Sequence, residues 1–133
     1  MRMRSIKMLC IKMTMTDEEL KVIGLEVVDL FKNRSFEKIG STYGYALKMD
    51  SSAEEAIEQD FDVAITECGG NIEQSKIAVA VSHFEPNETG LKSLVECNFQ
   101  LGVSVGVLVE LIQTDSGSIY LEQVSSYGGT SNA

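Results

Sequence analysis

The chain has few of the residues on which metal and nucleophilic sites most often depend. It contains one histidine, three cysteines and one proline, and it has no tryptophan. Cys10, Cys68 and Cys97 do not have the CxxC spacing of zinc sites, and one histidine is too few for most metal triads. An odd number of cysteines without that spacing fits a reducing compartment. The sequence therefore predicts no metal and no cofactor.

Long hydrophobic runs are also missing. The opening MRMRSIKMLCIKMTM begins with basic residues, but Lys7 and Lys12 interrupt it before it reaches the length of a signal-peptide core. No later stretch approaches the ~20 apolar residues that a membrane span needs. We therefore expect a cytoplasmic protein that does not enter a membrane.

Basic residues are scarce after residue 12. The chain has eleven Lys and Arg against twenty Asp and Glu, a net charge of −9. Residues 1–12 hold four of the bases and none of the acids, so residues 13–133 carry seven bases against twenty acids. Such a negative field repels nucleic acids and anionic membranes, and it favours encounter with basic proteins. Acidity also keeps many proteins dispersed in solution, so a basic partner and a merely solvated surface are both open interpretations.

Length and composition predict one compact domain. The 133 residues are 44% hydrophobic and 23% charged. That is enough apolar surface for a single core and too little polar bias for disorder. We therefore treat 1–133 as a single domain, in which residues 1–15 are either a leader or an edge strand and residues 128–133 form a loose tail.

Apolar residues recur at helical spacing in three segments before residue 69. A capping box at Thr16–Glu19 begins the first helix, which ends near Asn33. Ser35 begins the second helix, Asp50, Ser51 and Ser52 offer caps for the third, and the Gly69-Gly70 pair ends it. The predicted apolar stripes are Leu20, Ile23, Val27, Val28 and Phe31 in the first helix, Phe36, Ile39, Tyr43 and Leu47 in the second, and Ala53, Ala56, Ile57, Phe61, Ala64, Ile65 and Cys68 in the third.

From residue 75 onward the apolar period changes to two, which predicts strands. Turn residues separate four such segments, at about 76–83, 94–101, 103–112 and 118–127, and Gly106 indicates a bulge in the third. Short turns join antiparallel strands, because parallel strands need long crossovers.

The order of elements predicts an α+β fold with N-terminal helices packed on one face of a curved antiparallel sheet of about four strands. This order is similar to that of cystatin-like and NTF2-like proteins. A likeness of element order implies an architecture and transfers no function.

The segment SSAEEAIEQDFD, residues 51–62, carries five carboxylates and no base. At about 100° per residue, Glu54, Glu58 and Asp62 form one row with Glu55 beside it, away from the apolar stripe. Like charges at this spacing repel each other by a few tenths of a kcal/mol, so the row does not stabilise an isolated helix. It is either a solvated helix face or a surface that binds a basic partner.

Asp60 differs from these four residues because it falls within the apolar stripe. A buried carboxylate needs a partner. Tyr43 or Tyr45 could donate a phenolic hydrogen bond, and His83 lies on the strand row that should face the helices. An Asp60 and His83 pair would suit general acid-base chemistry on a small ligand, and a purely structural hydrogen bond explains the same residues.

In size, acidity, reduced cysteines and lack of familiar catalytic motifs, the chain resembles the immunity proteins that bacteria pair with secreted toxins, including those of contact-dependent growth inhibition. The resemblance implies a non-enzymatic inhibitor, a monomer or homodimer, that neutralises a basic toxin. Its interface residues would be Glu54, Glu55, Glu58 and Asp62.

Two other functions remain open. The first is an NTF2-like ligand-binding protein or isomerase-like enzyme, with a pocket between helices and sheet at Asp60, His83, Tyr43 and Tyr45. The second is a dimeric adaptor that uses an apolar patch on the open sheet face. That patch would consist of Ala78, Ala80, Leu94, Leu108 and Ile112.

Overall fold

The computed structural model describes residues 15–46 and 52–128. Apart from Met15 and Gly128, the predicted leader or edge strand over residues 1–15 and the predicted tail over residues 128–133 lie outside the described residues. Leu47 of the second predicted apolar stripe and the predicted caps Asp50 and Ser51 also lie outside them.

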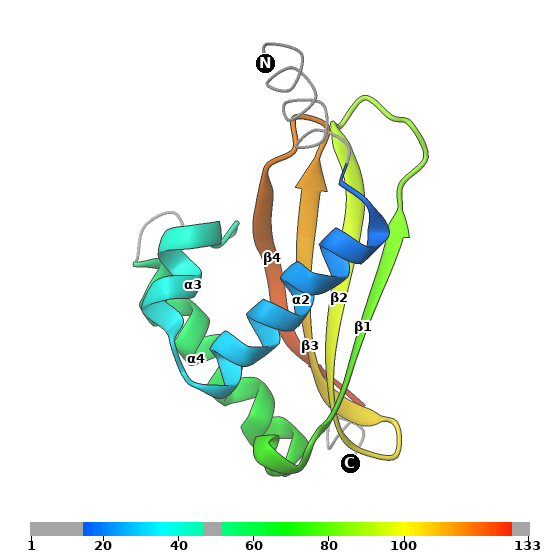
Figure 1. Cartoon of the computed structure of the whole chain (residues 1–133). Helices are drawn as coiled ribbons and strands as arrows, with labels where there is room; N and C mark the ends of the chain where they lie inside the picture. The colour runs from blue at the N-terminus through cyan, green and yellow to red at the C-terminus, as the bar shows by residue number, and fades with distance from the viewer. Residues whose placement is uncertain (1–14, 47–51, 129–133) are drawn as a thin grey trace.

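Three described helices precede a four-stranded sheet in the chain (Figure 1). The helices are α2 (Asp17–Lys32), α3 (Phe36–Tyr43) and α4 (Ala53–Cys68), and a short 3-10 turn follows at Ile72–Gln74. The strands are β1 (Lys76–His83), β2 (Leu91–Gly102), β3 (Val105–Thr114) and β4 (Ile119–Tyr127).

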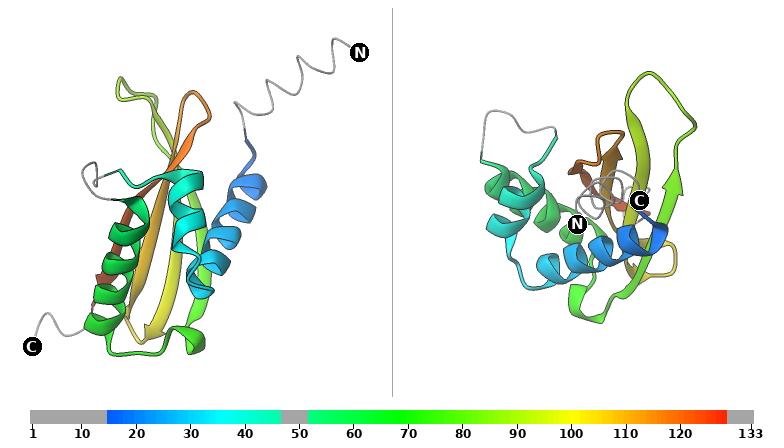
Figure 2. Two further views of the ribbon diagram at one scale, coloured as in Figure 1. Left: turned by 90° about the vertical axis from the view of Figure 1, so that its left-hand side faces the viewer. Right: turned by 45° about the horizontal axis from the view of Figure 1, so that its top comes forward.

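The strands pair antiparallel in chain order, β1-β2-β3-β4. The left view of Figure 2 looks onto the helical layer, where α4, α3 and α2 lie side by side in front of the curved sheet. The prediction of an α+β fold with helices on one face of a curved antiparallel sheet is therefore confirmed.

The starts of α2 and α4 follow from their capping residues, whereas Ser35, predicted to cap α3, forms no side-chain capping hydrogen bond. The Thr16 hydroxyl accepts a hydrogen bond from the Glu19 N–H at 3.1 Å, and the Glu19 carboxylate accepts one from the Thr16 N–H at 2.8 Å. The Ser52 hydroxyl caps α4 in the same way, at 3.1 Å from the Glu55 nitrogen. Gly69, with φ of 71°, ends α4 in the left-handed conformation that glycine adopts without strain.

Phenylalanine rings fill the space between helices and sheet. The Phe31 ring of α2 lies 4.8 Å from that of Phe61 in α4, centroid to centroid, and the Phe61 ring lies 5.8 Å from that of Phe99 in β2. Phe36 of α3 completes the cluster at 5.9 Å from Phe61. All four side chains are buried. Cys97 is fully buried in the same core, and burial raises the pKa of its thiol to about 12.

Two details of the predicted strands were wrong. β3 begins at Val105, because Val103 and Ser104 form the tight turn after β2. The register of β2 with β3 does shift beside Gly106, between Gln100 and Gly102, but the extra residue, Leu101, belongs to β2 and not to the third strand as predicted. Gly106 instead leaves room for Tyr127, whose hydroxyl would lie 2.7 Å from an added Cβ.

Gly24 sets the distance at which α2 crosses the sheet. A Cβ atom at this position would lie 2.6 Å from Val79 Cγ1 and 3.0 Å from Val95 Cγ1. Both valines lie on the helix-facing side of the sheet, so α2 could accommodate an added methyl group only by moving outward.

We expect Gly24→Ala to destabilise the protein by about 1–3 kcal/mol, because this overpacking outweighs the better helix propensity of alanine. Urea denaturation followed by circular dichroism measures the change. Val22→Ala, at a side chain 53% exposed on the same helix, is the control and should shift stability by less than about 0.5 kcal/mol. Equal stability of Gly24→Ala and wild type would contradict the close approach.

Candidate functional site

The acidic row of α4 is partly paired within the molecule. Arg34, in the turn between α2 and α3, donates to Asp62 Oδ1 and Oδ2 at 3.1 Å each and to Glu58 Oε2 at 3.2 Å. Its guanidinium also lies 5.0 Å from the centre of the Phe36 ring. Arg34 has φ of 56°, an uncommon conformation for a residue other than glycine, and the hydrogen bonds to Asp62 raise its pKa.

This pairing divides the four predicted interface residues into two groups. Glu58 and Asp62 hold Arg34 and thereby tie the α2–α3 turn to α4, although all three side chains remain about half exposed. Glu54 and Glu55 are exposed, and within residues 15–46 and 52–128 neither forms an ion pair. Only these two carboxylates can meet a basic partner without competing with an internal arginine.

Asp60 has a tyrosine partner. The Tyr45 hydroxyl donates to Asp60 Oδ2 at 2.7 Å, and Tyr45 is 9% exposed. The Ala46 N–H donates to the Leu121 carbonyl at 3.0 Å, so this contact joins α4 to the segment that runs along the outer edge of β4. Burial, followed by the hydrogen bond to Asp60, raises the pKa of Tyr45. One of the two tyrosines predicted for Asp60 is therefore its partner.

The structure does not pair His83 with Asp60. The His83 ring contacts Asp17 Oδ1 through Nε2 at 2.7 Å and the Ser93 hydroxyl through Nδ1 at 2.9 Å. Tyr43 lies apart from both, in a hollow of about 300 Å³ between α2 and α3. The four predicted pocket residues thus belong to three separate places, because phenylalanine rings occupy the space that a shared pocket would need.

Asp17, His83 and Ser93 are the residue types of a serine-hydrolase triad, in hydrogen-bond contact. A neutral imidazole can donate to Asp17 from Nε2 and accept the Ser93 proton at Nδ1. Ser93, however, is fully buried, so its hydroxyl cannot meet a substrate. The chain of hydrogen bonds instead ties the start of α2 to the end of β1.

Gln113 lies opposite Ser93 in the register of β2 and β3. Its side chain is 1% exposed, and among the described residues neither its amide nitrogen nor its amide oxygen has a hydrogen-bond partner. A buried amide without partners costs about 1–3 kcal/mol. The sequence signals nothing unusual at this position, since the orphaned amide results from the surroundings alone.

A GxSxG pattern, which sequence reasoning missed, spans Gly102–Gly106. In serine hydrolases this pattern joins a strand to a helix, whereas here Ser104 lies in the turn between β2 and β3 with φ of 64°. His83, the only histidine in the chain, lies at the other end of β1 from Lys76, which pairs with Gln100 near this turn. Ser104 therefore has no histidine base within reach.

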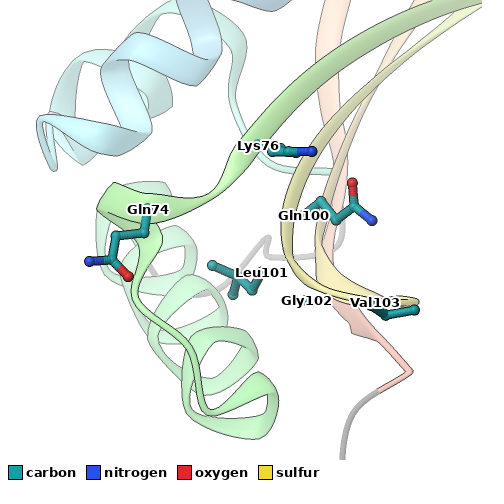
Figure 3. Close-up of a pocket in the computed structure, with 6 residues that line it drawn as sticks. All are labelled: Gln74, Lys76, Gln100, Leu101, Gly102 and Val103. Atoms are coloured by element: carbon teal, nitrogen blue, oxygen red, sulfur yellow. The ribbon is translucent and has the colours of Figure 1, made fainter.

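An open hollow of about 290 Å³ lies beside the same turn (Figure 3). Its lining is largely neutral, and the only ionisable side chain in it is Lys76. In Figure 3, Leu101 projects toward the segment that carries Gln74, while Val103 extends away from it at the turn. The lining of the hollow thus contains no carboxylate, histidine or cysteine.

The open face of the sheet carries a second acidic row. Glu96 of β2 lies directly opposite Glu110 of β3, and Glu122 of β4 adjoins Glu110 where the register between β3 and β4 shifts. All three side chains are partly buried. Burial, together with the negative charges of Glu96 and Glu122, raises the pKa of Glu110.

Small and apolar residues surround this sheet-face row, by which we mean Glu96, Glu110 and Glu122. A hollow of about 320 Å³ adjoins the row and contains Leu108 and Tyr127, whose hydroxyl donates to Asn98 Oδ1 at 2.7 Å. The prediction that Ile112 is exposed on this face was wrong. Ile112 is only 5% exposed, between its strand neighbours Leu94 and Tyr120.

Comparison with protein-family models, with curated proteins and with solved structures found no match to this chain. None of the helices described is both long enough and apolar enough to cross a membrane. In residues 15–46 and 52–128, no cluster of three or more His, Cys, Asp and Glu side chains is arranged to hold a metal ion.

Glu110→Gln should stabilise the protein in a pH-dependent way. A carboxyl with a raised folded-state pKa binds protons more readily when folded, so its contribution to stability falls as the pH rises through that range. We expect the variant to melt at a higher temperature than wild type at neutral pH, and the difference to shrink below the ordinary glutamate pKa. Thermal unfolding across this pH range measures it, with Glu88→Gln in the β1–β2 loop as control. A difference that is largest in acid would contradict the raised pKa.

Gln113→Met should also stabilise the protein, by about 1–3 kcal/mol, because methionine fills a similar volume without burying an unpaired amide. Urea denaturation of this variant and of Gln123→Met, at an exposed position in β4, gives the comparison. A loss of stability specific to Gln113→Met would show that the amide has a polar partner in solution.

Proposed function

We propose that the protein binds and neutralises a basic protein partner, as immunity proteins do for bacterial toxins. The observation that carries this proposal is the sheet-face row, in which Glu96 lies directly opposite Glu110. Like charges at such positions are destabilising, and here they are also partly removed from water. A lysine or arginine from a partner would turn this repulsion into attraction.

The surroundings of the row fit a protein interface. Interfaces commonly combine aromatic side chains with a few charged groups, and Tyr120 and Tyr127 flank the carboxylates on β4. The negative charge of the whole chain would speed the encounter with a cationic partner, as in other electrostatically steered complexes.

The acidic row of α4 supports the same function at a second surface. Glu54 and Glu55 lie in the first turn of α4, exposed to solvent. Because Arg34 already occupies Glu58 and Asp62, the sheet-face row is the stronger of the two candidate surfaces.

Charge reversal distinguishes the two surfaces. We expect tagged protein to retain its partner from lysate and culture fractions of the source cells at low salt. Mass spectrometry would then identify that partner for recombinant binding assays. We expect Glu96→Lys to weaken binding at least about tenfold, or ~1.4 kcal/mol, and moderate salt to weaken binding by wild type. Glu96→Lys should fold well, since it places a lysine opposite Glu110.

Two matched variants complete the experiment. Glu88→Lys, in the exposed β1–β2 loop, makes the same change of charge and should bind as wild type does. Glu54→Lys with Glu55→Lys tests α4. Loss of binding only in the α4 variant would move the interface to α4. Binding that resists salt and every reversal, or binding that leaves the partner's activity intact, would refute an acidic inhibitor.

A further inference from the structure

The outer edge of β1 is open to another strand. β1 forms one edge of the sheet (Figure 1), and within residues 15–46 and 52–128 no strand pairs with its outer side. The outer edge of β4 is different, because Tyr45 bridges to Leu121 and the Ala46 N–H donates to the Leu121 carbonyl. The sheet thus has one partly covered edge and one open edge.

The register identifies the backbone groups that face outward. The Phe84 N–H donates to the Lys92 carbonyl at 2.9 Å, and this pair continues the unbroken register of β1 with β2. Because alternate residues of an antiparallel strand bond to the same neighbour, the even-numbered residues of β1 bond to β2. The odd-numbered residues point their N–H and C=O groups outward. They are Ile77, Val79, Val81 and His83.

The β1 edge lacks the features that usually prevent strand addition. Proteins protect exposed edges with proline, with charged side chains or with bulges. Between Lys76 and His83 the strand contains none of these, since its residues are apolar or small and its register with β2 is regular.

A groove runs beside this edge on the helical side of the sheet. It has a volume of about 420 Å³ and lies between the start of α2 and the middle of β1. α2 contributes Asp17, Glu18 and Lys21, and β1 contributes Val79, Ala80 and Val81. The groove therefore pairs an apolar floor with two carboxylates against one amine, and of the two carboxylates Asp17 already contacts His83 while Glu18 forms no ion pair within residues 15–46 and 52–128.

We propose that β1 binds an extended segment of a partner protein, which adds to the sheet as a fifth strand. Side chains of an added strand alternate between the two faces of the sheet. On the face toward α2, side chains of the added strand lie beside Asp17 and Glu18, so we expect them to be basic. On the other face they lie beside Ala78 and Ala80, so we expect them to be apolar. This inference rests on the β1 edge and holds whether or not the sheet-face row binds a toxin.

A second copy of the chain fits the groove less well. Antiparallel pairing of two β1 strands would place Ile77, Val79 or Val81 of one copy toward Asp17 and Glu18 of the other, with no basic side chain to meet them. Two copies would also bring together chains of net charge −9.

Residue-resolved amide hydrogen exchange of the full chain tests the proposal. The probe is a blocked peptide of alternating lysine and valine, about ten residues long so that it spans β1. A second peptide has the same composition with its lysines and valines in separate blocks. We expect the alternating peptide to slow exchange at Ile77, Val79, Val81 and His83 by roughly tenfold or more, and the block peptide to have little effect. In the free protein these amides should exchange faster than those of Ala78, Ala80 and Ser82.

Variants separate backbone pairing from charge. Val79→Pro removes an outward N–H while leaving the β1–β2 bonds in place, and it should abolish the protection. Glu18→Lys should weaken peptide binding, whereas Glu88→Lys, with the same change of charge, should not. If Val79→Pro does not fold, the proposal is tested by the difference in peptide binding between Glu18→Lys and Glu88→Lys and by the exchange pattern of the wild-type protein.

Three results would overturn the proposal. The first is equal protection by both peptides, or by neither. The second is protection of the odd-numbered amides in the free protein at every dilution, which would mean that the chain itself covers its edge. The third is protection that disappears on dilution together with a dimer mass, which would identify a second copy as the occupant.

Discussion

The phenylalanine cluster that joins the helices to one face of the sheet is the interaction on which the rest of the structure depends. Phe31, Phe61 and Phe99 come from two helices and a central strand, so a single contact region holds both layers together. Because α2, α3 and α4 all pack on this one face, no described helix covers the opposite face and no described strand pairs with the outer side of β1. The same packing explains why Asp60, His83 and Tyr43 do not converge on a ligand. The surfaces that remain available for function lie outside the core.

The two acidic rows illustrate how the same charge can have different roles. On α4, Arg34 satisfies Glu58 and Asp62, and the row acts partly as an attachment point for the α2–α3 turn. On the sheet, Glu96 and Glu110 lie opposite each other, and burial, together with the negative charges of Glu96 and Glu122, raises the pKa of Glu110. An internal ion pair of exposed residues adds little stability, whereas an uncompensated cluster gains from any cation that reaches it. The difference favours the sheet as the binding surface.

Local sequence signals predicted most of the fold, because caps, stripes and turns act over a few residues. The capping box at Thr16 was predicted to the residue, and the end of α4 was predicted at the Gly69-Gly70 pair, of which Gly69 is the cap. Contacts between distant segments were much less predictable. Asp60 was expected to need a partner, but only the path of the chain along β4 shows that Tyr45 provides it. The sheet-face row depends on register, since Glu96 and Glu110 become neighbours only when β2 and β3 align. Gln113 carries no local signal at all.

The burial of Cys97 has a practical consequence for studying the motions of this molecule. Its sulfur lies against α2, 3.5 Å from the Gly24 carbonyl, and the thiol is fully buried. A thiol reagent can reach Cys97 only after α2 separates from the sheet, and the high pKa leaves almost no thiolate until that happens. The rate at which Cys97 is alkylated therefore reports how often the helical layer opens, at a position between the two surfaces of interest. The chain thus contains a natural kinetic probe of its own layer-to-layer contact.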